Sequence, residues 1–224
     1  MTSKLDRIKE VSGSSVFKLV ACDMIGVKET MYSGFCAHPN ERVQRAIKLE
    51  KETELKVLPD FVFAVNLVLP GPDFVYHCVS YFAVDDKSIL TDTNTPFGRV
   101  AKPFFFGESD EFRDKTFKLI PRIVDGNFIV RNAVGSKPAI LGQKVKQHYI
   151  RNERFFELII DVASDGVASG IVKLALGYAK SLVVDMMFVL ESTEEDQLPE
   201  RILGGLRMIN VDFKGKDGQR RITS

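Results

Sequence analysis

The chain has 224 residues, of which 45% are hydrophobic and 27% are charged, and its net charge at pH 7 is +1. This near-neutral balance, without a basic helix, argues against a nucleic-acid-binding surface, so no nucleic-acid partner is expected. The length suits a single domain, residues 1–224, with a large buried core.

Cysteine usage and the first residues favour a soluble protein of the cytoplasm. The chain has three cysteines, Cys22, Cys36 and Cys78, at irregular spacing. An odd number without a regular pattern argues against a disulfide framework and is typical of proteins in a reducing compartment. The N-terminus lacks the apolar core of a secretion signal. The longest apolar run, 171–190, contains three charged residues and would cross a bilayer only at high cost. We therefore expect a cytoplasmic location, with peripheral membrane contact as a further expectation.

In chain order, the first predicted elements are a polar lead-in at 1–14, expected to be flexible, and a short strand at 16–21. Residues 38–58 predict a surface helix or an ordered loop. The clearest strand signals are the apolar, β-branched runs at 61–69 and 74–84, which flank a Pro-Gly-Pro-Asp turn. These two runs predict an antiparallel hairpin.

The middle of the chain predicts a loop, a short helix and three strands. Residues 85–99 are polar and predict the loop. Ser109 precedes two acidic residues, which is good N-cap chemistry for a helix that extends to about Leu119. Three strands are then expected, at 127–134, 143–150 and 154–162.

The last third predicts one long helix. Apolar residues recur at helical spacing after a Ser-Asp-Gly start, and they predict an amphipathic helix at 166–182 whose small residues would let it approach a sheet closely. A strand at 183–190 and a short helix at 198–206 follow. A last strand is expected at 207–213, and the basic tail at 214–224 is expected to be flexible.

Seven or eight strands with one long late helix predict an α+β fold. An antiparallel sheet has to bury one face against another element. Only the helix at 166–182 is large enough to cover such a face. We therefore expect a curved, mostly antiparallel sheet wrapped around that helix, a helix-grip-like arrangement.

The segment FRDKTFKLIPRIVDGNFIVRNAVGSKPAILG resembles the C-terminal domain family of the plant enhanced disease resistance 2 protein. The resemblance covers residues 61–213 and includes VFAVNLVLPG, FFELIIDVAS, LALGYAKSLVVDMMFVLES and QLPERILGGLRM. The chain has Phe128 where the family has Trp, and Gln197 where it has Glu. Plant relatives carry a lipid-transfer domain and a phosphoinositide-binding domain upstream, so the resemblance implies lipid-associated biology through those neighbours.

The aromatic composition predicts either an aromatic-lined pocket or a phenylalanine-packed core. The chain has seventeen Phe and no Trp. Ligand sites are concave and largely apolar, so we expect ligand-binding wall residues between sheet and helix. They are Phe61, Phe63, Tyr76, Phe82, Phe128, Phe156, Leu174 and Tyr178.

A basic segment predicts an anion-binding or headgroup-binding surface. Between Arg113 and Lys137 there are six basic and two acidic residues, a surplus of +4. The guanidinium fork of Arg matches phosphate oxygens. The alternative is that these charges are solvated or form ion pairs, and Arg131 could point inward to Asp161 or Asp185. The candidate anion residues are Arg113, Lys118, Arg122, Arg131 and Lys137.

Catalytic and metal sites are not expected. His38, His77 and His148 have no metal-ligand spacing, and adjacent His77 and Cys78 would point to opposite faces of a strand. The glycines form no phosphate-binding motif. Asp161 and Asp185 lie in apolar runs, where a structural ion pair is expected, although a raised pKa would suit acid–base chemistry.

We therefore expect non-enzymatic binding of a hydrophobic small molecule, a lipid or another long apolar ligand, in a cavity between sheet and helix. No other cofactor is expected. One alternative is an enzyme acting on such a ligand through Asp161 or Asp185 with His148. Another is a protein-interaction domain with a solid core.

Overall fold

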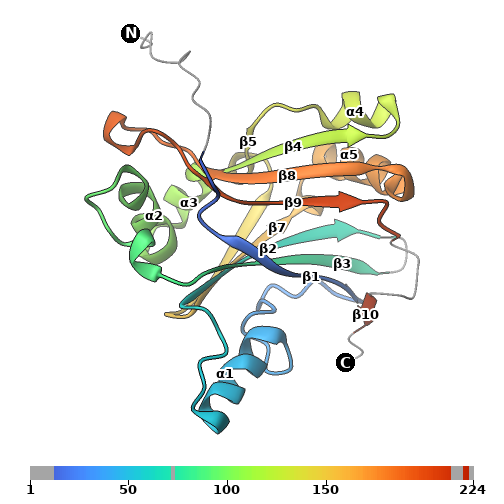
Figure 1. Cartoon of the computed structure of the whole chain (residues 1–224). Coiled ribbons are helices and arrows are strands. Elements are labelled where there is room, and N and C mark those ends of the chain that lie inside the picture. Colours follow the sequence, from blue (N-terminus) through green and yellow to red (C-terminus); the bar gives the residue numbers. More distant parts are fainter. Residues whose placement is uncertain (1–12, 72–73, 213–218, 222–224) are drawn as a thin grey trace.

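The computed structural model describes residues 13–71, 74–212 and 219–221. Two β-sheets lie one above the other, with helices around them (Figure 1). The larger sheet has the order β10-β1-β3-β2-β7-β6, and the smaller one has the order β5-β4-β8-β9. The strands are β1 Lys18–Val27, β2 Phe61–Pro70, β3 Val75–Val84, β4 Phe117–Asp125, β5 Ala139–Ile140, β6 Lys146–Arg151, β7 Phe155–Asp161, β8 Val183–Leu190, β9 Ile202–Ile209 and β10 Gln219–Arg221.

Five α-helices connect and cover these strands in the described part of the chain. Short single-turn helices lie between several of them, among them Leu141–Gln143 and Ala179–Ser181. The α-helices are α1 Arg42–Thr53, α2 Pro96–Phe106, α3 Asp110–Thr116, α4 Phe128–Val134 and α5 Gly166–Gly177.

The hairpin predicted from the two apolar runs is confirmed. β2 and β3 pair antiparallel from Phe61 opposite Val84 to Pro70 opposite Val75. β2 also pairs with β7 in parallel, so the larger sheet is mixed. Almost every residue of β2 is buried, because both faces of this strand are covered. This double coverage explains why its sequence is a continuous apolar run rather than an alternating one.

One face of the larger sheet packs against the smaller sheet through a phenylalanine core. The ring centroids of Phe82 and Phe188, one from each sheet, are 5.7 Å apart, and Phe117 lies 5.6 Å from Phe188. Phe104 and Phe105 of α2 complete this packed region. The backbone N–H groups of residues 16 and 17 also donate to carbonyls of β9, which joins the two sheets along one edge.

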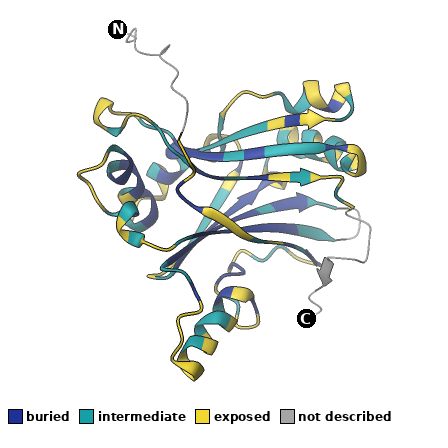
Figure 2. Ribbon diagram, viewed as in Figure 1, coloured by how far each residue is buried: buried dark blue, intermediate teal, exposed yellow. Residues whose placement is uncertain are grey.

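The other face of the larger sheet is covered by α1 and the loop before it. Phe35, Cys36 and Val43 from this region pack on Val62 and Val79 of the sheet. The surface helix expected at 38–58 is therefore confirmed as α1. Figure 2 shows the buried residues concentrated along the strands and the exposed ones on the outer side of this helix.

The α+β class is confirmed, but the single sheet wrapped around one long helix is wrong. The strands divide into two sheets, and the expected helix at 166–182 ends at Gly177, followed by a separate turn at Ala179–Ser181. The glycines of this helix do not lie against a sheet as expected. A Cβ added at Gly166, Gly170 or Gly177 would meet no atom within 4 Å.

Three other local expectations are also corrected. Residues 127–134, expected as a strand, form α4, since the Asn127 side chain accepts a hydrogen bond from the Ile129 N–H and caps the helix. Residues 198–206, expected as a helix, contain most of β9. The polar loop expected at 85–99 contains the start of α2, capped by Thr95.

The expected flexible ends are only partly described. Residues 1–12 of the lead-in, and 213–218 and 222–224 at the other end, lie outside the described residues. Gln219–Arg221, which belong to the expected flexible tail, instead form β10 and pair in parallel with β1. No helix among the described residues is long and apolar enough to cross a membrane.

Candidate functional site

An apolar cavity of about 290 Å³ lies between the two sheets, beyond the phenylalanine core. Its lining is entirely aliphatic or sulfur-containing, with no aromatic and no charged side chain. The lining comes from both sheets, from α4 and α5, and from the segments next to them. The residues are Leu67, Leu69, Cys78, Leu119, Pro121, Ile123, Val134, Ala139, Leu141, Val145, Ile160, Val162, Ala168, Ile171, Val172, Ala175, Leu176, Ala179, Leu182, Val184, Met186, Met208 and Val211.

Strand alternation builds two walls of the cavity. Leu67 and Leu69 of β2 lie two residues apart and share one face of the larger sheet. Leu119, Pro121 and Ile123 of β4 follow the same spacing on the smaller sheet. Each wall is therefore a row of side chains from one face of a sheet.

Helix α5 closes the cavity with a single stripe. Its lining residues, Ala168, Ile171, Val172, Ala175 and Leu176, recur at i, i+3, i+4, i+7 and i+8, which is one face of an α-helix. No residue of α5 is fully buried, although the helix is mostly apolar. This stripe faces the cavity instead of packed atoms, which explains why the residues of α5 are only partly buried.

None of the eight predicted wall residues lines this cavity. Phe61, Phe63, Phe82 and Phe156 are all 0% exposed and belong to the packed phenylalanine core. Aromatic rings of the two sheets fill the space at the phenylalanine core, whereas smaller aliphatic side chains line the cavity. The alternative of a phenylalanine-packed core therefore applies to these four residues.

The other four predicted wall residues lie elsewhere around the fold. Tyr76 is half-buried against the main core. Leu174 lies on α5 but packs beside Ile123 and Leu182 instead of facing the void. Phe128 is 69% exposed and points largely to solvent, whereas Tyr178 is 37% exposed.

Two of the five predicted anion-binding residues are used in the fold. Arg113 is 0% exposed, and its guanidinium donates to the carbonyls of Phe104 and Gly107 and to Asp110 Oδ1, the last at 2.6 Å. Burial, followed by the nearby charge of Arg151, lowers the pKa of Arg113. Lys118 is ion-paired with Glu191 and with Glu200, the second at 2.8 Å.

The other three anion candidates, Arg122, Arg131 and Lys137, are exposed. Arg122 lies opposite Asp185 in the β4–β8 ladder. Arg131 is on the outer side of α4, so the expectation that it points inward to a buried acid is not met. The structure thus separates the five candidates into two structural cations and three surface cations.

The acid–base candidates lie outside the cavity. Ile160 and Val162 line the cavity, so Asp161 between them points to the opposite face. There it accepts a hydrogen bond of 2.7 Å from Tyr32 Oη, whose ring lies 4.3 Å from that of His148. The hydrogen bond to Asp161 raises the pKa of Tyr32.

Asp185 forms the structural ion pair that the sequence favoured. Its carboxylate accepts from Arg207 Nε at 2.6 Å and Nη2 at 2.8 Å. These hydrogen bonds hold its pKa below the usual value, which is the opposite of what a general acid requires. Among the described residues, no group of three His, Cys, Asp or Glu side chains could hold a metal ion.

A buried polar network was not predicted from the sequence. Glu157, Asn66 and His77 come from β7, β2 and β3 and are all 0% exposed. Glu157 accepts from the backbone N–H of Phe35 at 3.1 Å and of Cys36 at 2.7 Å, and from Asn66 Nδ2 at 2.8 Å. The network therefore fixes the loop before α1 to the outer face of the larger sheet.

His77 completes this network as a neutral imidazole. Its Nε2 accepts from the Met31 N–H at 3.2 Å, so Nδ1 carries the proton and donates to Asn66 Oδ1 at 2.9 Å. Burial lowers the pKa of His77 to about 4, against a smaller opposing effect of Asp161. Neighbouring Cys78 lines the cavity on the other face, as strand alternation predicts.

Comparison with known proteins adds a family to this geometry. The family model described as "Protein ENHANCED DISEASE RESISTANCE 2, C-terminal" matches residues 3–212, which extends the expected resemblance into the first sixty residues. The chain is similar to "Protein ENHANCED DISEASE RESISTANCE 2-like" of Arabidopsis thaliana, with 34% identity over 208 residues. The match covers 93% of this chain and 26% of that relative, so the chain spans about a quarter of the relative's length. No solved structure matches the chain.

Proposed function

We propose that this chain, which belongs to the C-terminal domain family of ENHANCED DISEASE RESISTANCE 2, binds a hydrophobic small molecule in the cavity between its two sheets. The observation that carries the proposal is the wholly apolar lining of a cavity of about 290 Å³. Such a lining offers water no hydrogen-bond partner, and an apolar molecule removes its surface from water on entering.

The size of the cavity limits the ligand class. An engineered apolar cavity of roughly 150 Å³ binds benzene, and ligand pockets usually begin near 300 Å³. A volume of about 290 Å³ therefore suits part of an acyl chain or a compact apolar molecule. A longer lipid would extend beyond the cavity.

The position of the titratable groups supports binding rather than chemistry. Asp161 and His148 lie on the outer face of the larger sheet, and Asp185 is paired with Arg207. In this proposal α5 lines one side of the cavity, opposite strands of both sheets. We also propose a cytoplasmic location, which is supported by three free cysteines.

A matched pair of substitutions on α5 tests the proposal. Val172 lines the cavity, whereas Val167 is 74% exposed on the same helix. Val172→Phe fills part of the void, so titration with a fluorescent fatty acid should show binding at least tenfold weaker than for the wild-type protein. Val167→Phe adds the same atoms on the solvent side and should bind like wild type. The proposal fails if the wild-type protein shows no saturable uptake, or if the two variants bind equally well.

A further inference from the structure

Two cysteines from adjacent strands lie on the same face of the larger sheet. β1 and β3 are neighbours in this sheet (Figure 1). Cys22 of β1 is paired opposite Ser80 of β3, and Cys78 of β3 is paired opposite Met24 of β1. Opposite residues share a face, and so do residues two apart on a strand. Cys22 and Cys78 are therefore diagonal neighbours on the face that packs against the smaller sheet.

The two thiols of this pair differ in their access to solvent. Cys22 is exposed, whereas Cys78 is 2% exposed and lines the cavity. Both are free cysteines. A small reagent in solution can therefore reach the sulfur of Cys22, while the sulfur of Cys78 is accessible mainly from Cys22.

Hydrogen bonds around Cys22 favour its thiolate. Cys22 Sγ lies 3.6 Å from Ser80 Oγ. A hydrogen bond with Cys78 lowers the pKa of Cys22 to about 6, against the opposing effect of partial burial. The hydrogen bond with Ser80 adds to this lowering, and the charges of Asp23 and Arg42 have smaller effects of opposite sign. The thiolate is the nucleophilic form of cysteine, so Cys22 is the attacking member of the pair.

The third cysteine, Cys36, lies on the other face of the larger sheet. It is 0% exposed among the residues that join the loop before α1 to the sheet, and burial raises its pKa well above the usual value. In an unfolded chain Cys36 would be the preferred partner of Cys22, because it is closer in the sequence and the shorter loop closes at a lower entropic cost. The fold reverses this preference by placing Cys78 beside Cys22.

We infer that Cys22 and Cys78 form a peroxide-sensitive thiol pair that closes to a disulfide on oxidation. The Cys22 thiolate attacks one oxygen of hydrogen peroxide and the O–O bond breaks. The departing hydroxide takes up the proton that Cys22 released and becomes water, which leaves a sulfenic acid on Cys22. The sulfur of Cys78 then attacks the sulfur of Cys22, the S–O bond breaks, and the hydroxyl leaves with the Cys78 proton as a second water. The two thiols together lose two electrons, and one peroxide molecule gains them.

Closing this disulfide requires a small movement of β1. Diagonal neighbours in a sheet have Cβ atoms roughly 7 Å apart or less, whereas a disulfide needs about 4 Å. The pairing of β1 with β3 is irregular between Leu19 and Ala21, immediately before Cys22. Such an irregularity bends a strand locally and interrupts its ladder, so β1 can shift there. A strained disulfide is also readily reduced, which suits a bond that forms and breaks in a reducing compartment.

Peptide mapping of peroxide-treated protein tests the inference. Folded wild-type protein should lose two hydrogen atoms in mass and yield a cross-linked peptide pair that joins Cys22 to Cys78. Wild-type protein oxidised in urea should instead join Cys22 mainly to Cys36. The thiol of Cys22 should also disappear at least tenfold faster than that of Cys36 in the folded protein.

Three matched variants assign the roles of the thiols. Cys36→Ser should form the same cross-link as wild type. Cys22→Ser, at an exposed position, should form no intramolecular disulfide. Cys78→Ser should retain a sulfenic acid on Cys22, which dimedone traps as a covalent adduct.

Two results would overturn the inference. One is a folded wild-type protein in which Cys78 remains a thiol while Cys22 is unreactive or proceeds to a sulfinic acid. The other is a cross-link in the folded protein that involves Cys36, or one that persists in Cys22→Ser. The oxidation requires no ligand in the cavity, so it goes beyond the proposed function. The fatty-acid titration and the peptide map therefore succeed or fail separately.

Discussion

At the scale of single residues, His77 is the group whose protonation state the fold controls most directly. Both of its ring nitrogens are engaged, Nε2 as an acceptor from Met31 and Nδ1 as a donor to Asn66. A second proton would remove the acceptor and place a charge in a fully buried site. Burial accordingly lowers the pKa of His77 to about 4.

This lowered pKa predicts a loss of stability in acid. Below pH 6.5 the unfolded chain binds a proton at His77 that the folded chain does not bind until about pH 4. Stability should therefore fall as the pH falls through this window, by up to about 3 kcal/mol from this residue. Urea unfolding at several pH values measures the slope, which should be shallower in His77→Gln than in wild type. The His38→Gln control should keep the wild-type slope, and equal slopes for wild type and His77→Gln would contradict the assignment.

Residue chemistry also explains why the lining of the cavity differs from the predicted aromatic wall. Phenylalanine content indicates burial but does not distinguish a packed core from a void. Phe63, Phe82 and Phe156 pack with other rings, with centroids about 6 Å apart, and leave no space. The signal that marks the void is the aliphatic stripe on α5 opposite small and medium side chains of both sheets.

At the scale of elements, α5 combines weak local stability with a position over the cavity. It contains three glycines in twelve residues, and none of them is required by a close contact. A glycine within a helix lowers stability by about 0.5–1 kcal/mol relative to alanine. A helix of this composition with no fully buried residue is a low-stability element that can open before the sheets unfold.

Gly170→Ala tests this property of α5. The added methyl group would meet nothing within 4 Å, so the variant should be about 0.5–1 kcal/mol more stable in urea unfolding. Uptake and release of a cavity ligand, followed by stopped-flow fluorescence, should become slower because α5 opens less often.

Gly34→Ala provides the opposite case. Gly34 has a positive φ of 84°, and a Cβ there would lie 2.8 Å from Glu157 Oε2, so this variant should be less stable. A Gly170→Ala variant that is destabilised like Gly34→Ala, or that exchanges ligand faster than wild type, would contradict the role given to α5.

Elements with strong local signals could be predicted, whereas others depended on the rest of the fold. The β2–β3 hairpin follows from two apolar runs and their turn, and α3 from its Ser109 cap. Residues 128–134 are rich in β-branched side chains, yet they form α4 with an Asn127 cap and a glycine at its end. Here capping and packing against α5 outweigh strand propensity.

At the scale of the whole molecule, the sequence predicts the α+β class but not the division into two sheets. That division depends on pairings between distant segments, such as β2 with β7 and residues 16 and 17 with β9. Local periodicity carries no information about such partners. The cavity is a consequence of the division, because it lies where the two sheets are no longer joined by phenylalanine packing.

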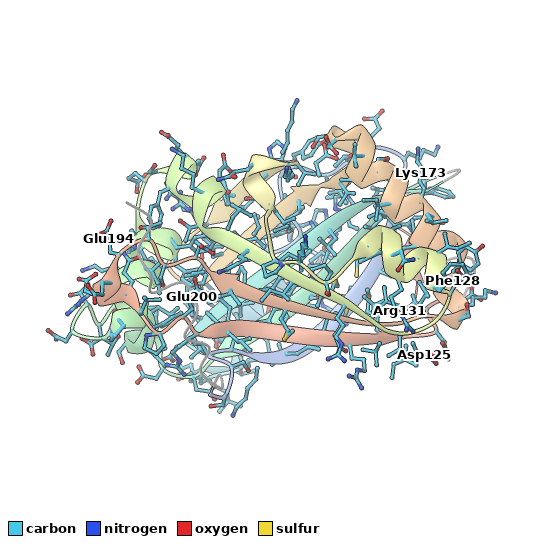
Figure 3. All side chains as sticks on the ribbon, turned by 90° about the horizontal axis from the view of Figure 1, so that it is seen from above. Asp125, Phe128, Arg131, Lys173, Glu194 and Glu200 are labelled. Atoms are coloured by element: carbon cyan, nitrogen blue, oxygen red, sulfur yellow. The ribbon has the colours of Figure 1, made fainter. Side chains whose placement is uncertain are left out.

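Charge is distributed unevenly over this architecture. Figure 3 shows Arg131 and Asp125 at one end of the molecule, and Glu194 and Glu200 of the acidic turn at 191–200 towards the other end. We propose a binding domain with one apolar cavity between its two sheets.

Native mass spectrometry of the protein, purified without detergent and then exposed to a total lipid extract, tests the claim that the cavity holds an apolar ligand. The wild-type protein and Val167→Phe should retain an apolar molecule, visible as a mass above that of the polypeptide. Val172→Phe should retain little or none. The claim would be contradicted by a wild-type spectrum that shows only the polypeptide, or by the same adduct at the same occupancy in Val172→Phe.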